Sequence, residues 1–389
     1  MVSIVVGLFS ITAAVNLQVP LYTTYAADAH VGNALTAIVF ASYVGGLIPV
    51  LILFGGASDR FGCKPILLLS LLCAFVATLA MIVLPSLRIL LFSRILQGIA
   101  VALSMGTCTA YLIKLYPDKS HKVATYVALA SALGFGSGAA CTTLVLSYHQ
   151  SISPASYWIV FVLTGFCFVS ILFGAPHTSK SIGKLIRVPT FPKGTLLVNL
   201  SIALAWTVSG LVIAVLPAQL KLYGLQYWVG PALFLVNGVG AACQLVVRKM
   251  KGVNALTLGF ILMPLGYGLL VLGSGIGSLV LILAGASIAG AACYGFTYLG
   301  GLNQIVKVAR NENSRAVSGY FLFAYLGFGI PSVLLGFIAD AIGTLRTLSY
   351  FAGVIVLCCI SLSIAISRRA HHDQKQATVT FDSRIDREQ

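Results

Sequence analysis

The sequence GGASDRFGCK, at residues 55–64, separates two long apolar stretches at residues 33–54 and 66–84. Only 8% of the chain is charged, yet this turn holds one acid and two bases. Each flanking stretch reaches the length of about 20 residues at which an apolar α-helix can cross a lipid bilayer. The turn therefore predicts a hairpin of two membrane-spanning helices joined by a short polar loop.

The composition extends this interpretation to the whole chain. Hydrophobic residues fill 59% of the 389 positions, and the mean hydropathy is +0.99, which leaves too few polar residues to cover a water-soluble domain. We expect an all-α membrane protein, because a helix satisfies its own backbone hydrogen bonds in lipid. Twelve stretches are long enough to span: 2–23, 33–54, 66–84, 88–112, 123–146, 156–175, 195–217, 229–247, 253–273, 277–299, 316–339 and 347–366. The first of them lacks a basic segment in front of it, so we interpret it as a span and not as a cleaved signal.

Basic residues are distributed unevenly between the two sides that twelve spans define. The net charge is +15, but the bases lie in short loops, which is typical of membrane topology and not of a nucleic-acid-binding surface. One side, with both termini and the Asp59 turn, holds 20 Lys and Arg residues, and the other side holds 3. We therefore expect an integral protein of the plasma (bacterial inner) membrane with both termini in the cytoplasm. Its expected partner is the lipid bilayer, and we expect no binding to nucleic acid.

A polar, basic segment divides the chain into two halves that share a weak repeat. At an offset of 193 residues, Lys114 corresponds to Lys307, and LGFG at 133–136 recurs at 326–329. The repeat joins spans 4 and 5 to spans 10 and 11, as a duplicated unit of six helices requires. We expect an N-terminal six-helix bundle at 1–175, a cytoplasmic linker at 176–194, a C-terminal six-helix bundle at 195–366 and a disordered cytoplasmic tail at 367–389.

The charged turn resembles the loop between spans 2 and 3 of the major facilitator superfamily of secondary transporters, whose pattern is G-x-x-x-D-R-x-G-R-K. The matching residues are Gly55, Asp59, Arg60, Gly62 and Lys64. Cys63 departs from the pattern, since the family prefers a base there. The resemblance, nearest to the drug and metabolite carriers, implies two bundles related by an axis along the membrane normal. It also implies that Asp59 locks the halves by facing the start of span 11, here Arg315–Ser318; alternatively, Asp59 caps a helix or complements helix dipoles.

Span 4 contains the one charged residue that lies well inside a predicted span. Arg94 begins RILQGIAVA, which resembles the family's span-4 motif, R-x-x-Q-G-x-x-x-A, at every fixed position. A cation in the hydrocarbon region costs at least about 2.5 kcal/mol, so it needs a partner. We expect Arg94 to bind an anionic group of the substrate or to modulate proton transfer. The alternatives are that it reaches the outer interface near Arg88 or pins helices together.

Glycines in span 5 resemble an exporter motif of the same superfamily, G-x-x-x-G-P-x-x-G-G, without its proline. They are Gly134, Gly136 and Gly138, and Pro331 in span 11 keeps a bend signal in the second half. Glycines allow helices to approach closely and to bend. We assign these four residues, with the matching residues of the turn, to a conformational gate.

Polar and aromatic residues in the spans are the candidates for substrate contact, because spans 1, 4, 7 and 10 line the central cavity in the superfamily. Besides Arg94, they are Asn16, Gln18, Asn199, Trp206, Asn237, Tyr294 and Tyr298. Tyr294 and Tyr298 share one helix face. Tyrosines also anchor spans at membrane interfaces, which is the alternative for both.

Acidic residues are absent from the predicted spans. Asp28 lies in the first outer loop and Asp340 at the outer end of span 11, and this placement weakens a simple proton-antiport mechanism. We expect neither cofactor nor metal, since the cysteines lie in apolar stretches or a basic loop. An enzyme is not expected, because no nucleophile, base and acid cluster together.

We expect a secondary active transporter that moves a small organic solute by alternating access, with or without a coupling proton, as a monomer. Export of a drug-like compound or metabolite is the first interpretation. Import of an organic anion or metal chelate is the alternative, favoured by Arg94, the missing proline and the lack of an embedded acid. An alternative of another class is a membrane receptor or scaffold that transports nothing.

Overall fold

The computed structural model describes residues 1–389 except 179–184, 187, 215, 310–312 and 389. Over the described residues the chain is helical and without strands, which confirms the all-α class. Within this part of the chain, twelve helical segments are long and apolar enough to cross a membrane: Val2–Asp28, Asn33–Leu53, Cys63–Val83, Leu87–Leu115, Thr125–Tyr148, Ala155–Gly174, Leu196–Leu222, Gln226–Val247, Gly252–Ile276, Leu279–Ala309, Arg315–Ile342 and Thr344–Arg368. The predicted spans agree with these within a few residues at most ends.

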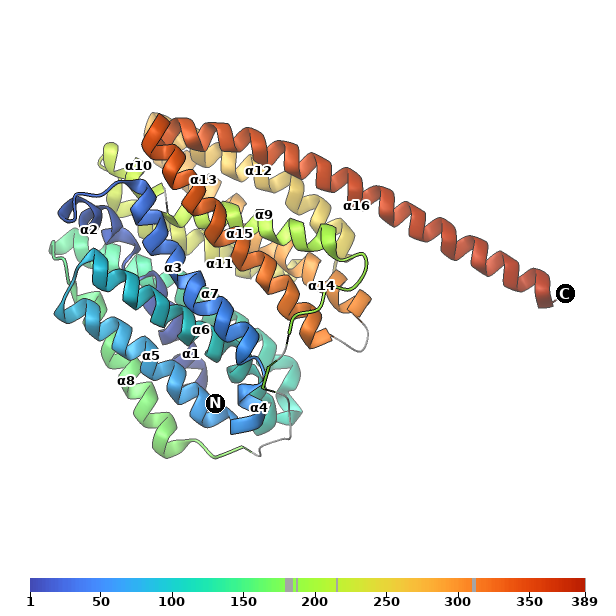
Figure 1. The fold of residues 1–389 in the computed structure, drawn as a ribbon, viewed down its shortest axis with the longest axis horizontal. Coiled ribbons are helices and arrows are strands. Elements are labelled where there is room, and N and C mark those ends of the chain that lie inside the picture. The colour runs from blue at the N-terminus through green and yellow to red at the C-terminus, as the bar shows by residue number, and fades with distance from the viewer. Residues whose placement is uncertain (179–184, 187, 215, 310–312, 389) are drawn as a thin grey trace.

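The helices form two bundles in chain order (Figure 1). The first bundle contains α1 (Val2–Asn16), η1 (Val19–Leu21), α2 (Tyr22–Asp28), α3 (Asn33–Leu53), α4 (Ala57–Phe61), α5 (Cys63–Val83), α6 (Leu87–Leu115), η2 (Pro117–Lys119), α7 (Ser120–Tyr148) and α8 (Ala155–Gly174). The second contains α9 (Leu196–Ala214), α10 (Leu216–Leu222), η3 (Gln226–Trp228), α11 (Val229–Val247), α12 (Gly252–Ile276), α13 (Leu279–Gly290), η4 (Ala291–Thr297), α14 (Tyr298–Ala309), α15 (Asn313–Ile342) and α16 (Thr344–Glu388).

Three spans are not uniform helices. Span 1 passes from α1 through the 3₁₀ segment η1 to α2, because Pro20 in η1 cannot donate a backbone hydrogen bond. Span 1 therefore reaches Asp28, five residues beyond its predicted end, although Asp28 is exposed there. Span 8 begins with the 3₁₀ segment η3 before the regular helix α11. Span 10 is π-helical over η4, between α13 and α14.

The two bundles meet mainly along two pairs of helices. Within the bundles, α1 packs on α7, α3 on α6, α9 on α15 and α12 on α13; between them, α3 packs on α15 and α7 on α11. Large apolar side chains such as Phe166, Phe173 and Leu357 are exposed on the surface. A hydrocarbon environment explains this exposure, which would be unfavourable in water.

We call the two ends of the bundle the Asp59 face and the Asp340 face, after one acid on each. The Asp59 face also carries Met1, whose ammonium donates to the hydroxyl of Tyr116 at 3.1 Å. From the Asp340 face, α16 runs back along the second bundle and continues to Glu388, projecting well beyond the other helices (Figure 1). Residues 367–388 are thus helical in the structure, whereas the polar composition predicted a disordered tail.

Candidate functional site

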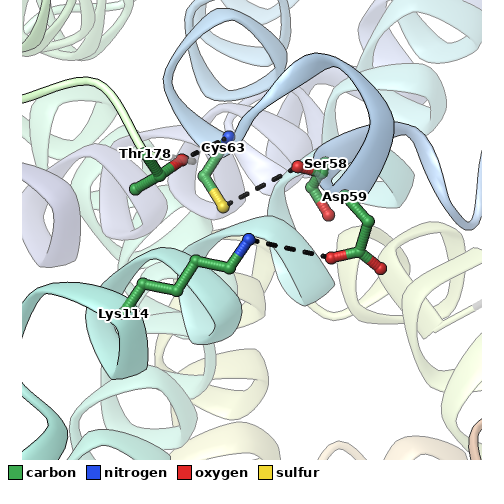
Figure 2. A network of polar contacts seen from close by, with 5 residues as sticks. All are labelled: Ser58, Asp59, Cys63, Lys114 and Thr178. Atoms are coloured by element: carbon green, nitrogen blue, oxygen red, sulfur yellow. Dashed lines mark hydrogen bonds and ion pairs between the residues drawn. The ribbon is translucent and has the colours of Figure 1, made fainter. Parts of the chain in front are cut away.

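The charged turn between α3 and α5 is built around α4 and Gly62. Gly62 has φ 94° and ψ 154°, a conformation that is open almost only to glycine, so the glycine of the motif allows α5 to begin here. Asp59 lies in the first turn of α4, and its carboxylate is 3.9 Å from the ammonium of Lys114 at the end of α6 (Figure 2). Both side chains are partly exposed. The contact of Asp59 with Arg315–Ser318 stays a prediction.

Two further residues of the motif, Gly55 and Arg60, are exposed on the Asp59 face. The Arg60 guanidinium lies 5.8 Å from the centre of the neighbouring Phe61 ring. At this distance and exposure the cation–π contact contributes little to stability. Arg60 is therefore open to contacts with water, lipid headgroups or the second bundle.

Lys64 and Cys63 fasten the turn to the segment after α8. The Lys64 ammonium donates to the carbonyl oxygen of Ala175 at 2.8 Å, at the C-terminal end of α8, where a cation is favourable. The Cys63 N–H donates to the hydroxyl of Thr178 at 3.0 Å, and its buried thiol lies 4.0 Å from the Ser58 carbonyl oxygen (Figure 2). The residue that departs from the family motif is thus a neutral side chain packed inside the turn.

The described parts of the linker contact both bundles on the Asp59 face. The N–H of Gly56 donates to the carbonyl oxygen of Leu185 at 3.0 Å. The Arg315 guanidinium donates to the carbonyl oxygen of Val188 at 3.0 Å, and the Thr190 N–H donates back to that of Arg315 at 3.1 Å. One part of the linker therefore lies against the charged turn and another against the start of α15.

Arg94 is wholly buried where α1, α3 and α6 meet. Its Nη1 donates to the carbonyl oxygen of Val15 at 2.7 Å, and its Nη2 donates to that of Phe40 at 3.3 Å. The guanidinium carbon also lies 5.2 Å from the centre of the Phe40 ring and 4.8 Å from that of Tyr43. Because the side chain is 0% exposed, the interpretation that it reaches the outer interface is wrong. Its Nε is buried without a hydrogen-bond partner in the described part of the chain.

Two glutamines continue this polar cluster. Gln97 accepts from Arg94 Nη1 at 3.5 Å and donates to the carbonyl oxygen of Ala14 at 2.9 Å. In the amide orientation that satisfies its neighbours, Gln18 accepts from Gln97 at 3.0 Å and donates to Ala14 and Val15 at 3.2 and 3.3 Å. The carbonyl oxygens of Ala14 and Val15 lie next to the break in span 1, where the regular helix ends. The predicted site residues Arg94 and Gln18 are thus brought together through Gln97, the glutamine of the span-4 motif.

Asn16 and two of the gate glycines hold α1 against α7. The Asn16 amide donates to the carbonyl oxygen of Phe135 at 2.7 Å. A Cβ atom at Gly134 or Gly138 would collide with the backbone of α1. These two glycines therefore allow close packing inside the first bundle.

Gly136 lies instead at the interface between the bundles. A Cβ atom there would come within 3.0 Å of Phe234 Cα in α11, and one at Gly329 within 3.3 Å of Val44 in α3. Gly136 and Gly329 are 193 positions apart, so the repeat places them at equivalent points of the two inter-bundle contacts. Pro331 lies within α15, two residues beyond Gly329.

The second bundle places aromatic rings together. The Trp206 ring centre is 4.9 Å from that of Tyr294 and 5.6 Å from that of Tyr298. Phe321 in α15 is 6.1 Å from Tyr298 and 6.4 Å from Tyr325, with both distances between ring centres. The sequence interpretation missed Phe321 and Tyr325, although their spacing of four residues indicates one helix face. Tyr294 lies in η4, and π-helical turns occur frequently at functional sites.

The two remaining candidates do not join these clusters. The Asn237 amide donates to the carbonyl oxygen of Leu233 in its own helix at 2.9 Å. Asn199 donates to the Thr195 hydroxyl at 3.4 Å and lines a cavity of about 310 Å³ beside the linker. It precedes Trp206 by seven residues, or about 10 Å along the helix.

Comparisons with known proteins support the fold. A sequence model described as the Major Facilitator Superfamily matches residues 4–330. The nucleoside transporter NupG, solved as a mutant, superposes with a TM-score of 0.74 at 11% identity, covering 94% of this chain and 98% of that one. A D-xylose-proton symporter gives 0.72 at 14% identity, covering 93% and 95%. A POT family transporter in complex with 5-aminolevulinic acid gives 0.73 at 13% identity, covering 94% and 96%. No curated protein matches the sequence.

Proposed function

This chain belongs to the major facilitator superfamily, and from that premise we propose that it is a secondary transporter of a small organic solute. The observation that carries the proposal is the placement of polar and aromatic groups on spans 1, 4, 7 and 10 inside a pair of six-helix bundles. The bundles contact each other mainly along two helix pairs, α3 with α15 and α7 with α11. Rocking about these contacts would open the interior to each side in turn.

Export of a drug-like compound or metabolite is the direction that we propose. The span-5 glycines support it, because they resemble the exporter motif of the superfamily apart from its proline. Import of an organic anion or metal chelate is the second candidate. It is supported by the missing proline of the span-5 motif. Gly138 is the repeat equivalent of Pro331, and it packs closely against α1 where a proline would favour a bend.

We place the Asp59 face in the cytoplasm of a plasma (bacterial inner) membrane. The 20-to-3 distribution of bases supports this orientation. The proposed units are the bundles at 1–175 and 195–366, the linker at 176–194 and the tail from 367. A single chain contains both bundles, so a monomer suffices for transport.

For Arg94 we propose a role as a tie between spans 1, 2 and 4. Its guanidinium donates to carbonyl oxygens of α1 and α3 and lies against two aromatic rings. A solute cannot reach the 0% exposed side chain in this conformation. Substrate contact is better supported for the aromatic group of Trp206, Tyr294 and Tyr298.

The decisive experiment is transport by the purified protein in proteoliposomes. A library of solutes would first be screened for those that raise the thermal unfolding midpoint, and each hit would be tested in counterflow and with an imposed pH gradient. Empty liposomes and a Trp206→Ala variant serve as controls. We expect counterflow for at least one hit. A protein that binds solutes but moves none in either direction would be a receptor or scaffold.

A further inference from the structure

We propose that Asp340 is a latch that holds the outer face of the transporter closed; this inference rests on the proposed alternating-access function. Asp340 lies in the last turn of α15, in the second bundle. Its Oδ1 accepts from the backbone N–H of Asn33 at 2.8 Å and from the Asn33 amide at 3.0 Å. Its Oδ2 accepts from the N–H of Ala34 at 2.9 Å. One carboxylate thus caps the beginning of α3, in the other bundle.

The chemistry of the two helix ends favours this contact over a purely local role. An acid in the last turn of α15 lies at the negative end of its own helix dipole, which is unfavourable. The beginning of α3 offers unpaired N–H groups and the positive end of a dipole. Gly32, just before α3, lets the carboxylate approach, since a Cβ atom there would be 2.7 Å from Oδ2. The contact across the bundles therefore accounts for an acid at a position that its own helix disfavours.

The latch closes a tightly packed seam. A Cβ atom at Gly336, one turn before Asp340, would be 2.8 Å from the Cβ atom of Ala37 and 3.1 Å from the carbonyl oxygen of Asn33. Further along, Gly329 packs against Val44. The outer half of α3 therefore lies directly against α15, and α3 cannot move away while Asp340 holds its first turn.

The repeat shows that the two seams differ in this contact. Gly336 and Thr143 are 193 positions apart, and so are Gly230 and Ala37. In the equivalent seam between α7 and α11, the N–H of Gly230 donates to the hydroxyl of Thr143 at 3.1 Å. The equivalent of Asp340 is Ser147, which donates to a carbonyl of its own helix.

At the Asp340 face, neutral hydrogen bonds thus close the seam between α7 and α11, and one of 2.7 Å joins Gln150 to Tyr227 beside it. At the Asp59 end of this seam, the Arg248 guanidinium donates to the Thr125 hydroxyl at 3.2 Å. Charge-assisted hydrogen bonds close the seam between α3 and α15, and these are the stronger kind. To open the outer face, the protein must break three of them at Asp340. The latch therefore biases the resting equilibrium towards the outer-closed conformation.

The experiment measures access to the seam and needs no substrate. A cysteine is placed at Val44, which is 7% exposed, and a membrane-impermeant charged thiol reagent is applied to membrane vesicles from each side in turn. The protein without Val44→Cys gives the background from its nine native cysteines. In the Asp340→Asn variant, the amide cannot accept all three hydrogen bonds, and labelling from the Asp340 side should rise about tenfold.

Two further variants complete the test. Asp28→Asn removes another exposed acid on the same face and should leave the labelling rate unchanged. Asn33→Ala removes only the side-chain donor and should give a smaller rise than Asp340→Asn, and it serves as a second test if Asp340→Asn is poorly folded. Parental labelling rates in both Asp340→Asn and Asn33→Ala would overturn the latch. Since labelling needs no cargo, failure of the latch and failure of the transport function are distinguishable.

Discussion

Arg94 carries a permanent charge where lipid and packed helices surround it, so its neighbours decide whether it stabilises the fold. An arginine at the centre of a membrane helix costs about 2.5–3.5 kcal/mol. Each hydrogen bond from a charged donor contributes about 1.5–3 kcal/mol, and a desolvated cation–π contact about 2 kcal/mol. Two hydrogen bonds to carbonyl oxygens and two ring contacts together exceed the cost. The balance therefore favours a structural tie.

From this balance we predict that Arg94→Ala lowers stability. The thermal unfolding midpoint in detergent should fall by several degrees. The midpoint of Arg94→Lys should fall less than that of Arg94→Ala, because an ammonium keeps the charge. It should still lie below the parental midpoint, because the two separate donors of the guanidinium are lost. Solute binding by the surviving folded Arg94→Ala protein should be close to parental. An unchanged midpoint together with lost binding would instead assign Arg94 to the substrate.

Asp59 is predicted to act on conformation, independently of its neighbour Lys114. Asp59→Asn should reduce transport several-fold at normal protein levels, because the turn no longer presents a charge to the start of span 11. The ion pair with Lys114 is long, at 3.9 Å, and partly exposed, and such pairs contribute about 0–1 kcal/mol. Lys114→Gln should therefore transport nearly as the parent does. If both variants lose transport equally, the ion pair and not the motif carries the role.

At the scale of elements, the π-helical segment η4 presents Tyr294 to Trp206 in the middle of the second bundle. We predict that Trp206→Ala weakens solute binding about tenfold, since each aromatic contact contributes about 0.5–1.5 kcal/mol. Tyr298→Phe keeps its ring and should bind normally. The solute-induced shift of the unfolding midpoint measures both, and the midpoint without solute reports whether the fold is intact. Parental binding by Trp206→Ala would mean that these rings only fill the core.

Hydropathy predicted the elements well and their interruptions poorly. A span needs only length and apolar composition, so the twelve spans were readable from the sequence. The break in span 1 follows from Pro20, which was a visible signal. The sequence of span 10 did not indicate its π-helical turn, because an apolar π-helix and an apolar α-helix have similar amino-acid compositions.

The sites show the same division between local and spatial information. Gln18 and Arg94 were predictable as polar groups in an apolar span, but their connection through Gln97 depends on how α1 and α6 pack. Asp340 was visible as an acid at the end of a span. Its partner, Asn33, is 307 residues away, and no periodicity relates them. Contacts between bundles therefore need the three-dimensional arrangement.

At the scale of the whole molecule, the duplication gives two seams with the same packing and different chemistry. Positions 193 residues apart make equivalent contacts, as Gly336 with Ala37 and Thr143 with Gly230 do. The seams share small residues, which permit close approach, but the carboxylate of Asp340 has a serine as its counterpart. On the Asp340 face, charge-assisted hydrogen bonds therefore hold the seam between α3 and α15, whereas neutral ones hold the seam between α7 and α11.

The orientation of the whole molecule is the last prediction. The 20 bases on the Asp59 side and 3 on the opposite side predict that both termini lie in the cytoplasm. A reporter that is active only in the cytoplasm should work when it is fused after residue 389, and a tag between Tyr223 and Trp228 should be labelled by an impermeant reagent from outside. That loop follows α10 on the Asp340 face, and an odd number of spans separates it from the C-terminus. The loop and the C-terminus must therefore lie on opposite sides of the membrane. Fusions at residues 115–119, between spans 4 and 5, should behave as the C-terminal reporter does. Labelling of the 223–228 tag only after the membrane is permeabilised, with a silent C-terminal reporter, would invert the molecule and place Asp340 on the inner face.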